Sequence, residues 1–148
     1  MIYLASDHRG FKLKELIKNR FKKNNFKFKD LGYFQYQPDD DYPLIAVKLA
    51  KNILKNKVNR GIILCGSGVG VCIAVNRFKG IRGASSDNYK IIKKAREDDN
   101  INILCLPADF IDEKKAWLLI KTFLKTKFKN KEKYLRRIKQ LDNYDKLG

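Results

Sequence analysis

Short apolar runs of strand length alternate along the chain with longer stretches in which apolar residues recur every three or four positions. The runs predict five strands, over residues 2–5, 26–31, 61–65, 80–84 and 101–106. The longer stretches predict amphipathic helices around residues 13–21, 46–54, 71–75, 88–97, 112–125 and 131–142. The first of them illustrates the spacing, because Leu13, Ile17 and Phe21 fall on one helical face between polar residues. The pattern indicates an α/β protein.

Strands that alternate with helices build a parallel sheet that is covered on both faces, with right-handed crossovers. The run 61–65 is the most apolar and suits a central strand buried on both faces. A length of 148 residues fits one domain over residues 1–148 and is too short for two substantial cores. The expected fold is therefore a doubly wound, Rossmann-like sheet of five parallel strands in the order 2-1-3-4-5.

In that order the sheet reverses its winding direction between the first and third strands, and ligands bind beyond the carboxyl ends of those two strands. The segments that follow them are Asp7-His8-Arg9-Gly10 and Cys65-Gly66-Ser67-Gly68-Val69-Gly70. We therefore expect these two polar turns to be neighbours and to form the ligand site.

The second of these turns carries three glycines at alternate positions between a strand and a helix. Such a turn leaves backbone N–H groups bare and able to converge on an anion, next to the positive end of the following helix. It lacks the Lys-Ser/Thr of a Walker A loop and the GxGxxG spacing of a dinucleotide fingerprint. The alternative is a glycine-rich turn with a structural role only.

Cys65 ends the third strand directly before the glycines. We expect the helix amino terminus to lower the pKa of this thiol, so that it serves as a nucleophile or a general base. The alternative is a buried cysteine that acts as a small hydrophobic residue. We expect His8, the one histidine of the chain, to hold a phosphate group, and Asp7 to accept hydrogen bonds from sugar hydroxyls. The alternative for His8 is a solvated side chain without a role.

The chain carries 33 Lys and Arg against 16 Asp and Glu, a net charge of +17. This excess is spread over both halves, so we interpret it as solvated surface and not as a nucleic-acid patch, although residues 121–139 interleave lysines with aromatics. Three cysteines without a CxxC spacing, together with one histidine, support neither a disulfide framework nor a metal site. No apolar stretch is long enough to span a membrane, and the amino terminus does not read as a signal peptide. A cytoplasmic protein with reduced thiols is expected.

Four segments resemble a known family: SDHRGFKLK, DYP, CGSGVGVCIAVNRFKGIRGA and AREDDNINIL. They are similar, in order and over essentially the whole chain, to the RpiB/LacAB family, which contains ribose-5-phosphate isomerase B and galactose-6-phosphate isomerase. The resemblance implies an aldose–ketose isomerase that needs no cofactor and takes a phosphorylated sugar. It also implies a homodimer, or a tetramer of two such dimers, with active sites at the interface and a C-terminal helix that extends to the partner subunit.

The resemblance also implies roles for individual residues. Cys65 would be the base that moves a proton between C1 and C2 through a cis-enediolate, and Ser67 would help to move the hydroxyl proton. The backbone N–H groups of the turn would bind the enediolate oxygen. These groups belong to Gly66, Gly68, Val69 and Gly70, and the expected substrate-binding side chains are Asp7, His8, Asp41, Tyr42, Lys133 and Arg137.

Three positions depart from the family pattern. Asp98 and Asp99 stand where the family commonly has the pair His-Asn, whose histidine assists ring opening. We expect Asp98 to transfer protons and Asp99 to contact the substrate, although two carboxylates would repel a phosphorylated ligand unless protonated or paired. Asp109 stands where a phosphate-facing arginine is usual.

These observations predict an isomerase of D-ribose 5-phosphate and D-ribulose 5-phosphate, an activity of the pentose phosphate pathway. Three alternatives remain. The same chemistry on a hexose 6-phosphate is the first, and a non-catalytic module that binds a sugar phosphate or nucleotide on the same fold is the second. An RNA-binding protein is the third and has the least support, because the charge is diffuse.

Overall fold

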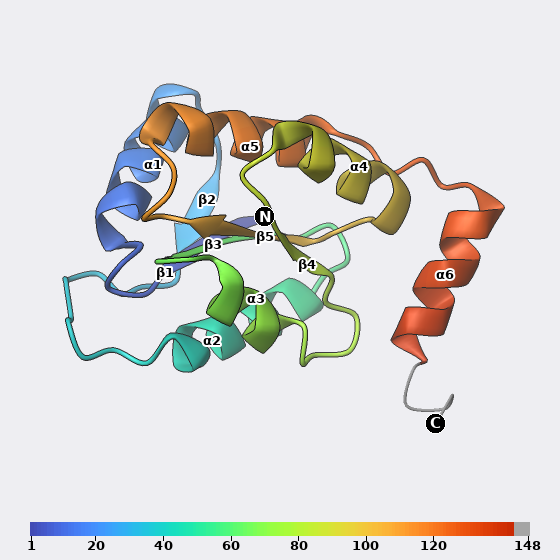
Figure 1. Cartoon of the computed structure of the whole chain (residues 1–148), viewed down its shortest axis with the longest axis horizontal. Helices are drawn as coiled ribbons and strands as arrows, with labels where there is room; N and C mark the ends of the chain where they lie inside the picture. Colours follow the sequence, from blue (N-terminus) through green and yellow to red (C-terminus); the bar gives the residue numbers. More distant parts are fainter. Residues whose placement is uncertain (144–148) are drawn as a thin grey trace.

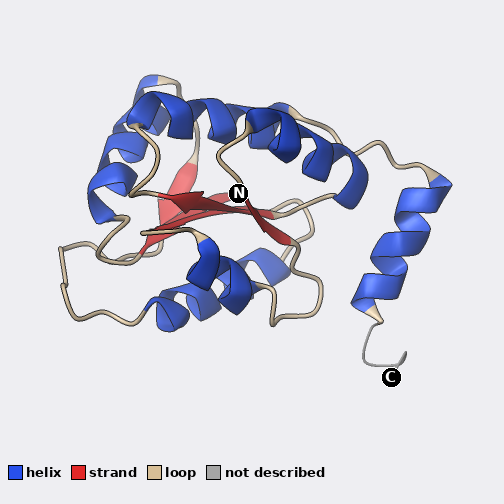
Figure 2. Ribbon diagram, in the orientation of Figure 1, coloured by secondary structure: helices blue, strands red, loops and turns tan. Residues whose placement is uncertain are grey.

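The protein folds as a three-layer α/β sandwich, seen here in a computed structural model that describes residues 1–143 (Figures 1 and 2). Five strands form one parallel sheet: β1 (Ile2–Ser6), β2 (Phe28–Asp30), β3 (Arg60–Cys65), β4 (Gly83–Ser85) and β5 (Ile103–Pro107). The helices are α1 (Phe11–Lys23), α2 (Tyr42–Leu54), α3 (Val69–Val75), α4 (Tyr89–Asp99), α5 (Glu113–Lys125) and α6 (Glu132–Asp142). The α/β class and the parallel sheet are thus confirmed.

The strand order is β2-β1-β3-β5-β4, so the predicted order 2-1-3-4-5 is wrong at one edge of the sheet. All five residues of β5 are buried, whereas β4 is three residues long and its side chains are partly or fully exposed. A strand buried on both faces gains most free energy between two neighbours, and a short strand of small residues costs least at the edge. β5 accordingly pairs with β3, and β4 lies outside it.

Each face of the sheet has its own apolar core. Helices α1, α4 and α5 cover one face, where Phe21 and Phe123 are fully buried. Helices α2 and α3 cover the other face, where Leu49 and Val71 are fully buried. Side chains of a strand alternate between the faces, so Leu64 joins the first core and Cys65 the second.

The last helix, α6, lies beside α4 at the edge of the molecule (Figure 1). Tyr134 is its one buried residue, while Leu135 and Leu141 are 46% and 58% exposed. Within residues 1–143, no helix is long and apolar enough to cross a membrane.

Candidate functional site

The turns after β1 and β3 are neighbours, as predicted. Ser6 pairs with Leu64 in the sheet register, and the N–H of Asp7 donates to the carbonyl oxygen of Leu64 at 3.1 Å. Gly10 crosses this point so closely that a Cβ atom there would lie 2.4 Å from the Leu64 oxygen. A glycine at position 10 therefore lets α1 begin directly over the end of β3.

The glycine turn bends back over the thiol of Cys65. Gly68 has a φ of +74°, in the left-handed region that favours glycine, and its N–H donates to Cys65 Sγ at 3.2 Å. Ser67 is exposed, and its Oγ accepts the N–H of Val69 at 3.3 Å. The thiol thus lies at the base of a turn whose backbone N–H groups surround it.

Cys65 is 5% exposed and belongs to the core beneath α2 and α3. Burial raises the pKa of its thiol above the ordinary value, and the N–H groups of Val71, Gly68 and Ser67 offset only part of that effect. The N–H groups at the helix amino terminus lower this pKa as predicted, but burial raises it by more, so the predicted net lowering is wrong. Desolvation of the thiolate outweighs the hydrogen bonds that favour it.

Asp7 and His8 stand at the same edge, in different environments. Asp7 is 5% exposed and accepts the N–H of Gly10 at 2.9 Å; burial, aided by the nearby charge of Asp40, raises the pKa of its carboxyl. His8 is partly exposed, and its Nδ1 lies 2.6 Å from Oδ1 of Asp40. Asp40 was missed from the sequence, because three adjacent aspartates in a loop give no signal for which one folds inward.

Asp41 and Tyr42 bring α2 to this edge. Asp41 occupies the N-cap position of α2 and is exposed, and Tyr42 is the first residue of the helix. The ring of Tyr42 lies so close to Gly70 that a Cβ atom there would be 2.8 Å from its Cζ. The predicted residues Asp7, His8, Asp41, Tyr42, Cys65, Ser67 and the glycines therefore gather at the carboxyl edge of the sheet.

Asp109 reaches the same edge and is paired. The N–H of Asp109 donates to the carbonyl of Gly66 at 3.0 Å, and the N–H of Ala108 to that of Cys65 at 2.8 Å, so the β5–α5 loop joins the glycine turn. The guanidinium of Arg9 forms an ion pair with the Asp109 carboxylate directly beside Gly66. The carboxylate that replaces the family's arginine is thus neutralised by Arg9, which sequence reasoning had not singled out.

Four predicted site residues lie elsewhere in the chain. Asp98 and Asp99 end α4, which runs antiparallel to the strands, and Lys133 and Arg137 lie on α6. Both segments are at the amino-terminal edge of the sheet, across the molecule from Cys65 (Figure 1). Asp98 pairs there with Lys94 at 2.9 Å, and this hydrogen-bonded ion pair lowers the pKa of the Asp98 carboxyl.

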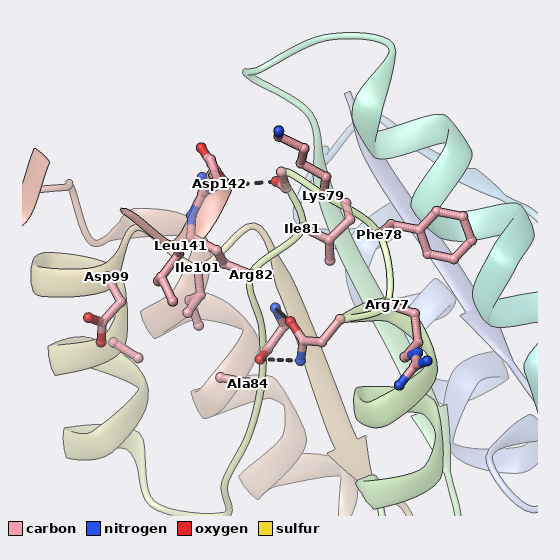
Figure 3. Close-up of a pocket in the computed structure, with 14 residues that line it drawn as sticks. Arg77, Phe78, Lys79, Ile81, Arg82, Ala84, Asp99, Ile101, Leu141 and Asp142 are labelled. Atoms are coloured by element: carbon pink, nitrogen blue, oxygen red, sulfur yellow. Dashed lines mark hydrogen bonds and ion pairs between the residues drawn. The ribbon is translucent and has the colours of Figure 1, made fainter. Parts of the chain in front are cut away.

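This second edge carries a cavity of about 590 Å³ between residues 76–84, which lead into β4, and the carboxyl-terminal ends of α4 and α6 (Figure 3). Asp99 lines it, and Arg82 pairs across it with Asp142 at 3.6 Å. Arg77 and Lys79 also line it, so basic and acidic side chains face the same space. The chain therefore presents two separated polar surfaces, one at each end of the strands.

Comparison with known proteins gives consistent matches over nearly the whole chain. A family model described as "Ribose/Galactose Isomerase" matches residues 2–141. A probable ribose-5-phosphate isomerase B of Mycoplasma genitalium is 38% identical over 146 residues, which cover 98% of this chain and 95% of the relative. The corresponding Mycoplasma pneumoniae protein is 39% identical over 127 residues, 86% of this chain and 84% of the relative.

Two solved structures superpose closely on this fold. Ribose-5-phosphate isomerase B from Mycoplasma genitalium with bound ribulose-5-phosphate has a TM-score of 0.92 and 37% identity, with 99% of this chain and 97% of that chain covered. A ribose 5-phosphate isomerase from Thermotoga maritima has a TM-score of 0.91 and 39% identity, with 96% and 97% covered.

Proposed function

Because this chain belongs to the ribose/galactose isomerase (RpiB/LacAB) family, we propose that it interconverts D-ribose 5-phosphate and D-ribulose 5-phosphate, with Cys65 as the base. The observation that carries this proposal is the thiol of Cys65 beneath the glycine turn, one strand away from Asp7 and His8. The relative from Mycoplasma genitalium binds ribulose-5-phosphate in its solved structure, which supports a pentose phosphate as substrate.

The reaction moves one proton between adjacent carbons. The Cys65 thiolate removes the proton from C2 of the linear aldose, and the C2–H electron pair forms the C1–C2 double bond of a cis-enediolate as the carbonyl oxygen takes the negative charge. The thiol then returns the proton to C1, while Ser67 helps to carry the hydroxyl proton from O2 to O1. Substrate and product have the same atoms, so the step needs no oxidant or reductant.

Burial of the thiol suits this task. A group with a raised pKa is a stronger base once ionised, and abstraction of a carbon-bound proton requires a strong base. The backbone N–H groups of Gly66, Gly68, Val69 and Gly70 would donate to the enediolate oxygen, where fixed donors contribute most to catalysis.

A second copy of the chain would complete the site. The end of α4 and the helix α6 lie at the opposite end of the strands from the carboxyl end of β3 (Figure 1). The residues Asp98, Asp99, Lys133 and Arg137 on these helices therefore do not face the Cys65 of their own chain. In a homodimer, the amino-terminal edge of one subunit would face the carboxyl edge of the other, so that Lys133 and Arg137 bind the phosphate group. Asp98 would then transfer protons during ring opening, and Asp99 would contact the substrate.

A coupled assay of ribulose 5-phosphate formation tests the mechanism. Replacement of Cys65 by Ala should lower kcat by at least roughly 10²-fold, the range expected for loss of a general base. Cys72→Ala is the control, because Cys72 lies on α3 and is given no part in the proposed reaction. Equal activity of wild type and Cys65→Ala would remove the proposed mechanism.

The choice of sugar is tested separately. A panel of pentose 5-phosphates and hexose 6-phosphates, measured as kcat/KM, should favour ribose 5-phosphate. A higher kcat/KM for a hexose 6-phosphate would leave the proposed proton transfer in place but contradict ribose 5-phosphate as the preferred substrate. Thermal stabilisation by these ligands without turnover would instead indicate a binding module.

A further inference from the structure

His8 is held by a carboxylate that no sequence pattern assigned. Its Nδ1 lies 2.6 Å from Oδ1 of Asp40, a residue 32 positions away on the loop between β2 and α2. The side chain of Asp40 is 1% exposed, whereas that of His8 is 27% exposed. The loop has therefore turned a charged carboxylate inward, against the ring.

The contact with His8 engages only one of the two carboxylate oxygens of Asp40. Its second oxygen, Oδ2, is buried and has no hydrogen-bond partner among residues 1–143. A buried carboxylate with one oxygen unpaired is costly unless a cationic or strongly donating group faces the other oxygen. His8 is the donor that the structure places there, so the two side chains form one unit.

We propose that Asp40 is a positioning residue, which accepts the Nδ1–H of His8 and so fixes Nε2 as the ring atom that meets the phosphate group of the substrate. This inference rests on the proposed function. A carboxylate that accepts from Nδ1 sets the orientation and protonation pattern of the imidazole. With a phosphate oxygen at Nε2, both ring nitrogens carry protons and His8 lies as a cation between two anions.

The groups around His8 explain why a cationic imidazole is useful at this position. Asp7 precedes His8 in the chain, and Asp40 contacts its ring. The rings of His8 and Tyr36 meet edge to face, with their centroids 6.4 Å apart. Asp41 follows Asp40 on the same loop. A phosphate group that approaches these carboxylates is repelled unless a cation lies between them. His8, held by Asp40, is the side chain that would supply this positive charge.

The single histidine of the chain allows a direct test. Protein labelled with ¹⁵N-histidine gives one imidazole, whose two nitrogen shifts report the proton on each atom. In wild type, Nδ1 should be protonated and hydrogen-bonded, and addition of inorganic phosphate should shift Nε2 to its protonated value. An unprotonated Nδ1, or an Nε2 that ignores phosphate, would overturn the proposal whether or not the protein turns over a sugar.

Asp40→Asn removes the carboxylate charge, and Asp39→Asn is the matched control, with the same charge change at an exposed neighbour. An amide oxygen is a weaker acceptor than a carboxylate, so Asp40→Asn should weaken the Nδ1 hydrogen bond and move the Nδ1 shift away from its wild-type value. It should also raise KM for ribose 5-phosphate roughly tenfold or more, as expected for loss of a hydrogen bond to a charged group. Its kcat should stay close to that of wild type, and Asp39→Asn should leave both readouts unchanged. Equal KM values in the two variants would contradict a positioning role, and an inactive wild type with the expected shifts would contradict only the proposed function.

Discussion

A carboxylate at the mouth of an anion site repels the ligand only while its own charge is unpaired. The sequence predicts such a residue at Asp109, but the structure pairs its carboxylate with Arg9 beside Gly66. The partners come from loops 100 residues apart. The substitution at position 109 is therefore compatible with a phosphorylated substrate.

Removal of Arg9 should expose this charge. We expect Arg9→Ala to raise KM for the sugar phosphate about fivefold, since a half-exposed ion pair is worth up to about 1 kcal/mol. The double variant Arg9→Ala/Asp109→Ala should recover most of that loss, because it removes the repulsive carboxylate as well. Steady-state kinetics of the two variants and of Asp109→Ala measure the effect. A double variant as weak as Arg9→Ala would show that Arg9 acts on the substrate itself.

The free thiols should differ in reactivity. Burial raises the pKa of Cys65 above its ordinary value, whereas a hydrogen bond with Cys105 lowers the pKa of Cys72 to about 7. The thiolate is the reactive form, so Cys72 should alkylate faster at pH 7.5, and the rate at Cys65 should keep rising above pH 9. Peptide mapping by mass spectrometry after timed iodoacetamide treatment measures both rates. Faster labelling of Cys65 than of Cys72 at pH 7.5 would contradict the direction of these shifts.

Residue identity predicted the location of the candidate site better than the pKa values and contacts of its side chains. The adjacency of Asp7 and Cys65 could be predicted because each follows or ends an apolar strand at a polar turn. Such a strand and turn can be recognised from a few consecutive residues. The raised pKa of Cys65 and the contact of Asp40 with His8 depend on burial and on the path of a long loop. Neither is encoded by neighbours in the sequence.

At the level of elements, periodicity located every strand and helix, and its error lies in the order of two strands. The expected run 80–84 became β4 at Gly83–Ser85, and 101–106 became β5 at Ile103–Pro107. The apolar character of β5 and the glycines of β4 were visible in the sequence and favour a central and an edge position, respectively. The predicted order 2-1-3-4-5 instead assumes that β4 pairs next to β3 because it follows it in the chain, and sheets do not always keep that succession. The reversal of winding between β1 and β3 is unaffected, so the turns after these two strands are neighbours as predicted.

The junction between β1 and α1 depends on the absence of a side chain at Gly10. Its φ of −82° suits any residue, so the obstacle to alanine is steric: a Cβ atom would lie 2.4 Å from the oxygen, 2.6 Å from the carbonyl carbon and 2.7 Å from the Cβ of Leu64. Gly10→Ala should destabilise the protein by about 3 kcal/mol, at the upper end for overpacking of a buried site. Urea unfolding measures it, with Lys12→Ala on the exposed surface of α1 as the control. A change below about 0.5 kcal/mol, as for an ordinary surface substitution, would contradict the steric account.

At the scale of the whole molecule, the polar groups divide between the two ends of the strands. The thiol, the glycine turn and His8 lie at the carboxyl end, and Asp98, Asp99, Lys133 and Arg137 lie at the other end (Figure 1). α6 also presents two exposed leucines beyond the body of the domain. A symmetric dimer would bring unlike ends together twice, because an isologous interface repeats each contact.

Mixed dimers test this arrangement. One chain carries Cys65→Ala, the other carries Lys133→Ala and Arg137→Ala, and each bears a different affinity tag so that only mixed dimers survive two purification steps. If each active site takes its thiol from one chain and its phosphate-binding cations from the other, a mixed dimer holds one intact site and one site that lacks both sets. It should then show about half of the wild-type activity, while each parent homodimer stays nearly inactive. If the cations served the thiol of their own chain, every site in the mixed dimer would be damaged and its activity would stay at the parental level. Light scattering after size-exclusion chromatography provides the accompanying measurement, since a monomer at assay concentration would contradict the shared site before any kinetics are compared.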